Sequence, residues 1–382
     1  MLLIMRTVMT ESAYRGRSAA VFENHHLRVT VLREGGHIAE IFDKRTGVNP
    51  LWTPPWPAIE PSGYEPGDFP EYGTGAEAKL LAGIMGHNLC LDVFGGPSPE
   101  EAAAGVTVHG EGSVAPYQIA ESDGGIVMRA HLRQTGLEFV RRLELRGRAL
   151  AIRETVMNLT DFDRPIAWTQ HVTLGPPFLE PGVTLLAAPA TRSRVYESRF
   201  GADDYLQPGA DFDWPLAPGT AGGFADLRVC NGSPHSSAFT THLMDPEKEH
   251  AWFVAFSPSC KLAFGYVWRR ADFPWMGIWE ENHSRTNTPW NGVTEARGME
   301  FGVSPMPESR REMMERHRLF DVPTYRWLPA RSRLEVEYWA VAQSAETIPD
   351  SIDWPSASAG AEPIPIGTPI VPPARINNVV RP

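Results

Sequence analysis

The segment Gly125–Thr160, GIVMRAHLRQTGLEFVRRLELRGRALAIRETVMNLT, decides the fold that this chain is expected to adopt. Three runs rich in alternating apolar and polar residues follow one another at roughly ten-residue spacing, with breaks at Gly136 and Gly147. Alternation with a period of two is typical of a β-strand that is buried on one face. Strands that follow one another across glycine turns predict an antiparallel meander. Arg141 and Arg142 are expected on its solvent face.

The remainder of the 382 residues has the same character in shorter segments. Gly (34) and Pro (35) are both frequent, and the runs between them are mostly short and β-like. This combination predicts an all-β protein with many short strands, long structured loops and few short helices. All-β architectures often exceed 200 residues as a single unit, so one large core is available to this chain.

Charge and hydropathy exclude several kinds of partner. The 46 acidic and 35 basic residues give a net charge of −11, which argues against binding to nucleic acid or to an anionic membrane. No run approaches 18 apolar residues, and the start MLLIMRTVMT lacks the pattern of a signal peptide. We therefore expect a soluble, cytoplasmic protein with no membrane partner.

The sequence offers little support for metal or cofactor chemistry. The three cysteines are far apart and lack CxxC spacing, and no HxH or HxxxH pair accompanies a carboxylate. The GxSxG nucleophile motif and the two glycine-rich nucleotide motifs are also absent. We expect no metal site and no cofactor.

Two segments rich in aromatic residues stand out from the strands. The stretch Asn49–Gly75 contains too much Pro and Gly for regular structure, and long loops of this kind are usually functional. The stretch Phe273–Pro305 places three tryptophans among carboxylates, amides and a histidine. Tryptophan is mostly buried for packing. Aromatic faces beside carboxylates and amides are nevertheless what a polyhydroxylated ring requires.

Acid–base chemistry is the catalytic possibility that remains. His87, His109 and His171 each lie near a glycine turn or a strand end. A single strand histidine is more often a core residue than a catalyst, but their similar settings favour a common pocket. Glu300 is flanked by apolar and turn residues that can shield it from water. A histidine and a glutamate form a suitable pair for proton transfer near neutral pH.

The order of these features resembles that of the galactose mutarotase-like (aldose 1-epimerase) superfamily. An HG turn in TVHGE precedes a strand histidine in WTQHVTLG, and a glutamate in MEFGVSP precedes the closing strand RLEVEYWAV. The resemblance extends over roughly residues 20–345. It implies a large antiparallel β-sandwich that binds a carbohydrate and interconverts sugar anomers without a cofactor.

The resemblance also implies roles for individual residues. His109 corresponds to the histidine that binds the sugar, His171 to the general acid and Glu300 to the catalytic base. His87 and Asn88 are a partial counterpart of an Asn-Arg pair that holds the sugar in the family. In this interpretation Glu300 takes the proton of the anomeric hydroxyl while His171 protonates the ring oxygen.

The sequence departs from the family pattern in the Asn49–Gly75 insertion and in the segment WEENH. We expect WEENH to form a substrate-selecting wall, in which Trp279 stacks on the sugar. Glu281 or His283 would then contact its hydroxyl groups. Arg269, Arg270 and Arg285 could meet an anionic substituent, although exposed arginines near loops are usually just solvated.

Domain organisation and two other functions complete the expectations. We assign residues 1–20 to an N-terminal extension, 21–345 to the sandwich and 346–382 to a Pro-rich tail. One alternative function is a glycoside-processing enzyme that pairs Glu280 or Glu281 with Glu300. The other is a sugar-binding or regulatory module without catalysis.

Overall fold

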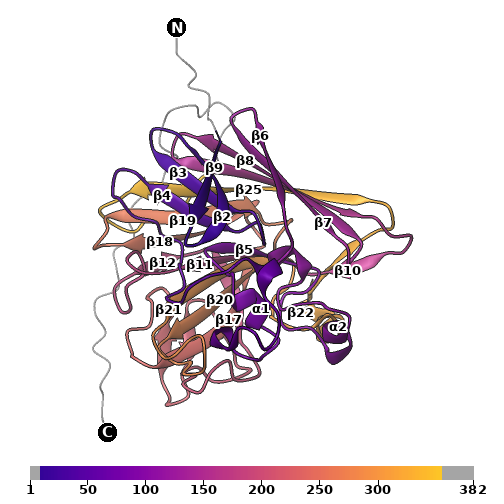
Figure 1. Cartoon of the computed structure of the whole chain (residues 1–382). Helices are drawn as coiled ribbons and strands as arrows, with labels where there is room; N and C mark the ends of the chain where they lie inside the picture. Colours follow the sequence, from indigo (N-terminus) through magenta and orange to yellow (C-terminus); the bar gives the residue numbers. More distant parts are fainter. Residues whose placement is uncertain (1–8, 355–382) are drawn as a thin grey trace.

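The computed structural model describes residues 9–354, which form two large antiparallel sheets stacked as a sandwich (Figure 1). Eleven strands make the large sheet, and eight make the second sheet. The sandwich and the all-β class predicted above are confirmed. No helix among residues 9–354 is long and apolar enough to cross a membrane.

The strands of the large sheet, in spatial order, are β1 (Thr10–Tyr14), β2 (Arg17–Glu23), β3 (Leu27–Leu32), β4 (Ile38–Asp43), β5 (His87–Leu91), β11 (Trp168–Leu174), β21 (Glu295–Gly302), β20 (Trp275–Asn282), β17 (Ser236–Met244), β13 (Ala190–Val195) and β14 (Asp211–Asp213). Those of the second sheet are β12 (Leu185–Ala187), β18 (His250–Ser257), β19 (Leu262–Arg269), β25 (Arg333–Ser344), β9 (Ala149–Asn158), β8 (Leu137–Arg146), β7 (Gly125–Leu132) and β6 (Gln118–Ser122).

Short elements connect and cover the two sheets. Pairs of short strands form between β10 (Arg164–Ile166) and β24 (Arg326–Leu328), β15 (Leu216–Pro218) and β16 (Phe224–Asp226), and β22 (Arg318–Leu319) and β23 (Val322–Pro323). The helices are α1 (Ala78–Leu81), α2 (Pro99–Ala103) and α3 (Arg310–Arg316), with single 3₁₀ turns at Pro61–Gly63, Pro70–Tyr72 and Glu111–Ser113.

The meander predicted from Gly125–Thr160 is present as β7, β8 and β9, which pair in sequence order. In β8 every second residue is buried, because alternate side chains point into the space between the sheets. Arg141 is one of these alternate residues and is buried, so the prediction that it lies on the solvent face is wrong. Arg142 is exposed as expected.

A buried polar network surrounds Arg141 between the two sheets. Its guanidinium lies 2.7 Å from the carboxylate of Glu154 on β9, and both side chains are shielded from solvent. Glu154 also accepts hydrogen bonds from Trp168 at 2.9 Å, Gln170 at 2.6 Å and Tyr338 at 2.7 Å. Buried charges persist in proteins only with such partners. The network therefore links the second sheet to β11 of the large sheet.

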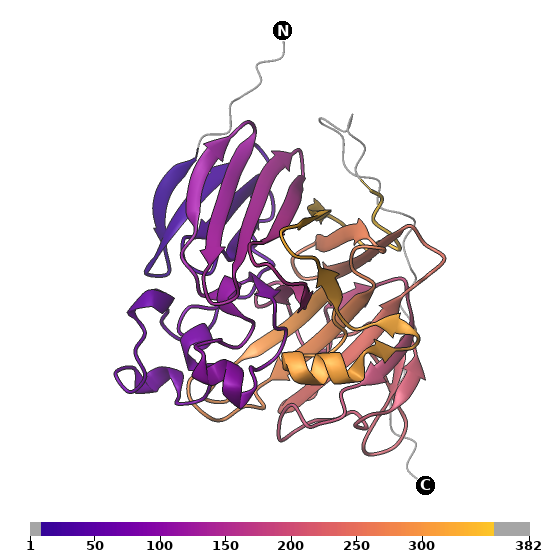
Figure 2. The same cartoon turned by 90° about the vertical axis from the view of Figure 1, so that its right-hand side faces the viewer.

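The outer face of the large sheet is covered by loops and short helices. Leu80 and Leu81 of α1 pack in one apolar cluster with Trp275 and Trp279 of β20, and Met313 of α3 belongs to the same cluster. Figure 2 shows α3 in orange lying across the strands. The predicted loop Asn49–Gly75 leads into α1, so this loop and its helix form part of the cover.

At both ends of the described residues, the strands and their packing can be compared with the expected domain boundaries. The sheet begins at Thr10, and residue 21 falls inside β2. Ile348 and Ile352 pack beside Val267 against the second sheet. The rest of the expected tail, residues 355–382, lies outside the described residues.

Candidate active site

The candidate site is built on one row of residues across the large sheet. Asn88, His171, Glu300 and Gly277 lie directly opposite one another on β5, β11, β21 and β20. Side chains at one register position of neighbouring strands emerge on the same face. The row therefore presents an amide, an imidazole and a carboxylate side by side, with a glycine at its end.

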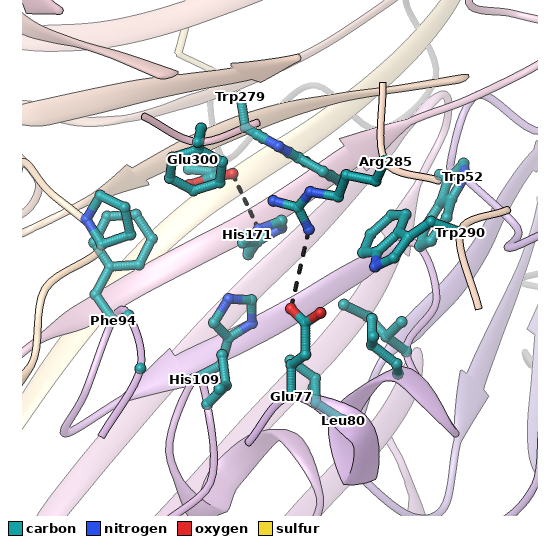
Figure 3. Close-up of a pocket in the computed structure, with 17 residues that line it drawn as sticks. Trp52, Glu77, Leu80, Phe94, His109, His171, Trp279, Arg285, Trp290 and Glu300 are labelled. Carbon is teal, nitrogen blue, oxygen red and sulfur yellow. Dashed lines mark ion pairs between the residues drawn. The ribbon is translucent and has the colours of Figure 1, made fainter. Parts of the chain in front are cut away.

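His171 and Glu300 are in direct contact. His171 Nε2 lies 3.0 Å from Glu300 Oε1, and both side chains are buried (Figure 3). The hydroxyl group of Thr173, two residues along β11, lies 3.1 Å from His171 Nδ1. With both ring nitrogens engaged, the imidazole is held in one orientation.

His109 approaches the pair from the loop before the Glu111–Ser113 turn. Its backbone has a positive φ of 66°, and Gly110 follows with φ 78°. The Asn88 side-chain amide donates to His109 Nδ1 at 3.0 Å, so the ring carries its proton on Nε2. Burial lowers the pKa of His109 well below its ordinary value, and nearby His171 lowers it further. His109 is therefore a neutral hydrogen-bond donor, 4.8 Å from the His171 ring between centroids.

A cavity of about 260 Å³ opens beside this pair. His109, His171 and Glu300 line one side of it, and Figure 3 shows their side chains directed toward the same space. Its aromatic walls are Trp52, Phe94, Phe200, Trp279 and Trp290. A cavity with mostly apolar walls and a few convergent polar groups is typical of a small-molecule site.

Arg285 brings a positive charge to the cavity from the loop between β20 and β21. Its guanidinium carbon lies 4.7 Å from the ring centroid of Trp290 and 5.6 Å from that of Trp279, so aromatic faces hold the cation. Glu281 accepts a hydrogen bond from the Arg285 backbone N–H at 2.9 Å, and its carboxylate lies 3.5 Å from Nε. On the other side of the cavity, Glu77 lies 3.9 Å from the guanidinium.

Comparison with known structures identifies the architecture. A protein from Klebsiella pneumoniae, proposed to be an aldose 1-epimerase, matches with TM-score 0.61 at 13% identity, covering 88% of this chain and 82% of that protein. Galactose mutarotase-like proteins from Clostridium acetobutylicum and Lactobacillus casei match with TM-scores of 0.56 and 0.54 at 13% and 14% identity. They cover 89% and 85% of this chain, and 99% and 100% of their own.

The chain has the galactose mutarotase-like fold. No protein-family model and no curated protein matches the sequence. At identities this low the likeness establishes the fold, and the roles of individual side chains are argued from their geometry.

Within the galactose mutarotase-like sandwich, four of the expected site residues line the cavity: His109, His171, Trp279 and Glu300. Asn88 lies behind them, where it fixes the ring of His109. His87 requires a correction, because it points to the opposite face of β5. There it contacts Tyr266 and Gln170 at 3.0 Å each, fully buried between the sheets.

Glu281 and His283 also differ from the expectation that they contact the ligand directly. Neither lines the cavity. His283 bonds to the Gly292 carbonyl at 2.9 Å and to Glu295 at 2.8 Å, and so it shapes the loop between β20 and β21. Glu281 positions Arg285 in the same loop, while burial raises its own pKa. Both residues contact the loop that carries Arg285.

The sequence analysis missed several cavity residues, among them Trp52, Glu77 and Phe94. Trp52 lies within the Pro-rich segment Asn49–Gly75 and Glu77 lies just after it, but no periodic pattern in this segment indicates where its side chains point. Within residues 9–354, no three His, Cys, Asp or Glu side chains gather in a way that could hold a metal ion.

Gly298 gives a direct test of the site geometry. A Cβ atom at this position would lie 2.4 Å from Glu300 Oε1, well inside contact distance. We expect Gly298→Ala to displace the carboxylate from His171 and to lower any His–Glu acid–base activity by about tenfold or more. Gly96→Ala is the control, since Gly96 also lines the cavity but has open space around its Cβ position. Equal activity of the two variants would contradict the assigned geometry.

Proposed function

We propose that this protein interconverts the anomers of an aldose, with His171 as general acid and Glu300 as general base. The observation that carries the proposal is the buried 3.0 Å contact between His171 Nε2 and Glu300 Oε1 at the wall of an aromatic cavity. The fold supports it as well, since a neighbour with the same architecture is itself proposed to be an aldose 1-epimerase.

Each residue of the pair has a defined part in the reaction. Glu300 as carboxylate takes the proton of the anomeric hydroxyl, while His171 as imidazolium gives the ring oxygen its Nε2 proton, which faces Glu300 when no sugar is bound. The bond between C1 and the ring oxygen breaks, and an open-chain aldehyde forms. Rotation about C1–C2 then presents the other face of the carbonyl. Ring closure returns both protons, so the pair recovers its starting state and the reaction needs no cofactor.

The surroundings of the pair suit a sugar ring. Trp279 lies 6.1 Å from the His171 ring between centroids and forms an aromatic wall beside the reacting groups. Sugars have apolar C–H faces that pack on aromatic rings and polar edges that need hydrogen bonds. His109 provides a neutral donor within the same space.

The experiment that tests the proposal is exchange NMR on a panel of free aldoses, which reports interconversion of α and β anomers. We expect acceleration above the spontaneous rate for at least one sugar. The rate should rise and then fall with pH, because turnover needs an ionised Glu300 and a protonated His171 together. A rate that is flat across the pH range, or no acceleration for any sugar, would argue against this mechanism.

The surroundings of Glu300 bear on one alternative function, and calorimetry combined with the exchange experiment tests the other. A glycoside-processing enzyme needs a second carboxylate facing Glu300 across the substrate. Glu280 points to the opposite side of β20, where it contacts Tyr205 and Arg297, and Glu281 is engaged by backbone N–H groups. A binding module would take up sugar in calorimetry but leave anomer exchange at its spontaneous rate.

A further inference from the structure

Arg285 has unused hydrogen-bonding capacity at the mouth of the cavity. Its guanidinium carries five N–H donors. Glu281 Oε2 at 3.5 Å and Glu77 Oε2 at 3.9 Å are its nearest carboxylate oxygens, and both are too distant for a good hydrogen bond. Within the described part of the chain, no residue accepts a hydrogen bond from the guanidinium. The aromatic rings of Trp279 and Trp290 hold the group in place without satisfying its donors.

Glu77 is the complement of Arg285 on the opposite side of the cavity. It directly precedes α1, and its carboxylate points toward Arg285 across the space between them (Figure 3). No hydrogen bond to this carboxylate comes from residues 9–354. The two side chains thus face each other as an acceptor and a donor 3.9 Å apart, which is longer than a hydrogen bond and close enough for one hydroxyl oxygen to lie within reach of both.

We propose that Glu77 and Arg285 form a clamp for one hydroxyl group of a neutral sugar, and that this clamp rejects acidic and phosphorylated sugars. The inference rests on the proposed function and narrows its substrate class. A hydroxyl group is both donor and acceptor, so it donates to Glu77 while it accepts from Arg285. A carboxylate or phosphate satisfies only Arg285 and is repelled by Glu77.

The clamp is separate from the pair of groups proposed to transfer protons. The Trp279 ring neighbours both functional parts of the cavity, with the His171 ring centroid 6.1 Å away and the Arg285 guanidinium carbon 5.6 Å away. Within residues 9–354, neither Glu77 nor Arg285 forms a hydrogen bond or ion pair with His171 or Glu300, so a sugar whose anomeric carbon lies at that pair meets the clamp with a different hydroxyl group. Glu77 and Arg285 therefore act on affinity and selectivity rather than on proton transfer.

The test compares three proteins and matched ligands. Calorimetry measures the binding of a neutral hexose, the corresponding uronic acid and the corresponding 6-phosphate to the unaltered protein, to Glu77→Gln and to Glu71→Gln. Glu71 is exposed on the same covering segment and does not line the cavity, so its variant controls for the loss of one negative charge. We expect the unaltered protein and Glu71→Gln to prefer the neutral hexose, and Glu77→Gln to lose about tenfold of that preference.

The possible outcomes separate the clamp from the proposed function. Equal or tighter binding of the acidic sugars to the unaltered protein overturns the clamp, as does identical behaviour of the two variants. Either result leaves anomer exchange on neutral sugars intact as a separate observation. Binding of none of the sugars overturns both the clamp and the proposed function. Arg285→Lys is a second variant, and we expect it to weaken hexose binding because an ammonium loses the planar geometry of the guanidinium.

Discussion

Replacing Glu300 by Gln should lower the rate of anomer exchange by about 10²- to 10⁴-fold. The amide has nearly the shape of the carboxylate, but it cannot take the proton of the anomeric hydroxyl. Glu300 is buried on the same face as His171 and at the same register position, so the substitution changes its chemistry with little change of volume. Exchange NMR on the sugar with the highest turnover measures the effect.

Two controls show whether the lost activity is caused by removal of the proton acceptor at Glu300. Glu335→Gln removes a carboxylate that is exposed on β25, and it should keep full activity. A double variant with His171→Asn should be no slower than the worse of the two single variants, because residues that act as a unit are not additive. Full activity of Glu300→Gln would remove the base assignment.

The second large effect concerns stability. Glu154→Leu should lower the free energy of unfolding by about 3–5 kcal/mol, because it leaves the guanidinium of Arg141 buried without a counter-charge. The loss extends further, since Trp168, Gln170 and Tyr338 also donate to this carboxylate. Urea denaturation followed by tryptophan fluorescence gives the measurement.

A surface pair on the neighbouring strands is the matched control for that variant. Arg129 and Glu138 lie 3.2 Å apart, with the Arg129 side chain 53% exposed. Glu138→Leu should therefore cost no more than about 1 kcal/mol. Removing both buried charges with Arg141→Leu and Glu154→Leu should recover part of the loss. A Glu154→Leu protein as stable as the surface variant would contradict the role of the network.

Much of the fold follows from local patterning. Alternation along Gly125–Thr160 defines β7, β8 and β9, because a strand buried on one face must repeat with a period of two. The same rule, applied to Arg141, would have placed it inward beside Phe139 and Leu143. Charge favoured the solvent face in the prediction, but a partner on another strand, Glu154, stabilises the buried position. Sequence order alone does not reveal such a partner.

The residues of the candidate site are likewise only partly predictable from the sequence. The contact between His171 and Glu300 agrees with the pairing that the family resemblance implied, although their catalytic roles stay predictions until activity is measured. His87 was placed with Asn88, but adjacent residues of a strand face opposite sides, so only one of them can reach the site. Glu77 and Arg285 come from loops, where no periodicity indicates the direction of a side chain.

Asn88, His171 and Glu300 share one register position on neighbouring strands. The backbone hydrogen bonds between these strands therefore fix the spacing of the three side chains. A slip of β21 by one residue would bring Met299 to the cavity and turn Glu300 into the interior, so the backbone pairing itself specifies the distance between His171 and Glu300. Trp279 comes from β20, which pairs with β21, but His109, Glu77 and Arg285, which also line the cavity, come from segments outside these strands. Such a scaffold can exchange its loops for a new ligand while the spacing of its His–Glu pair stays unchanged.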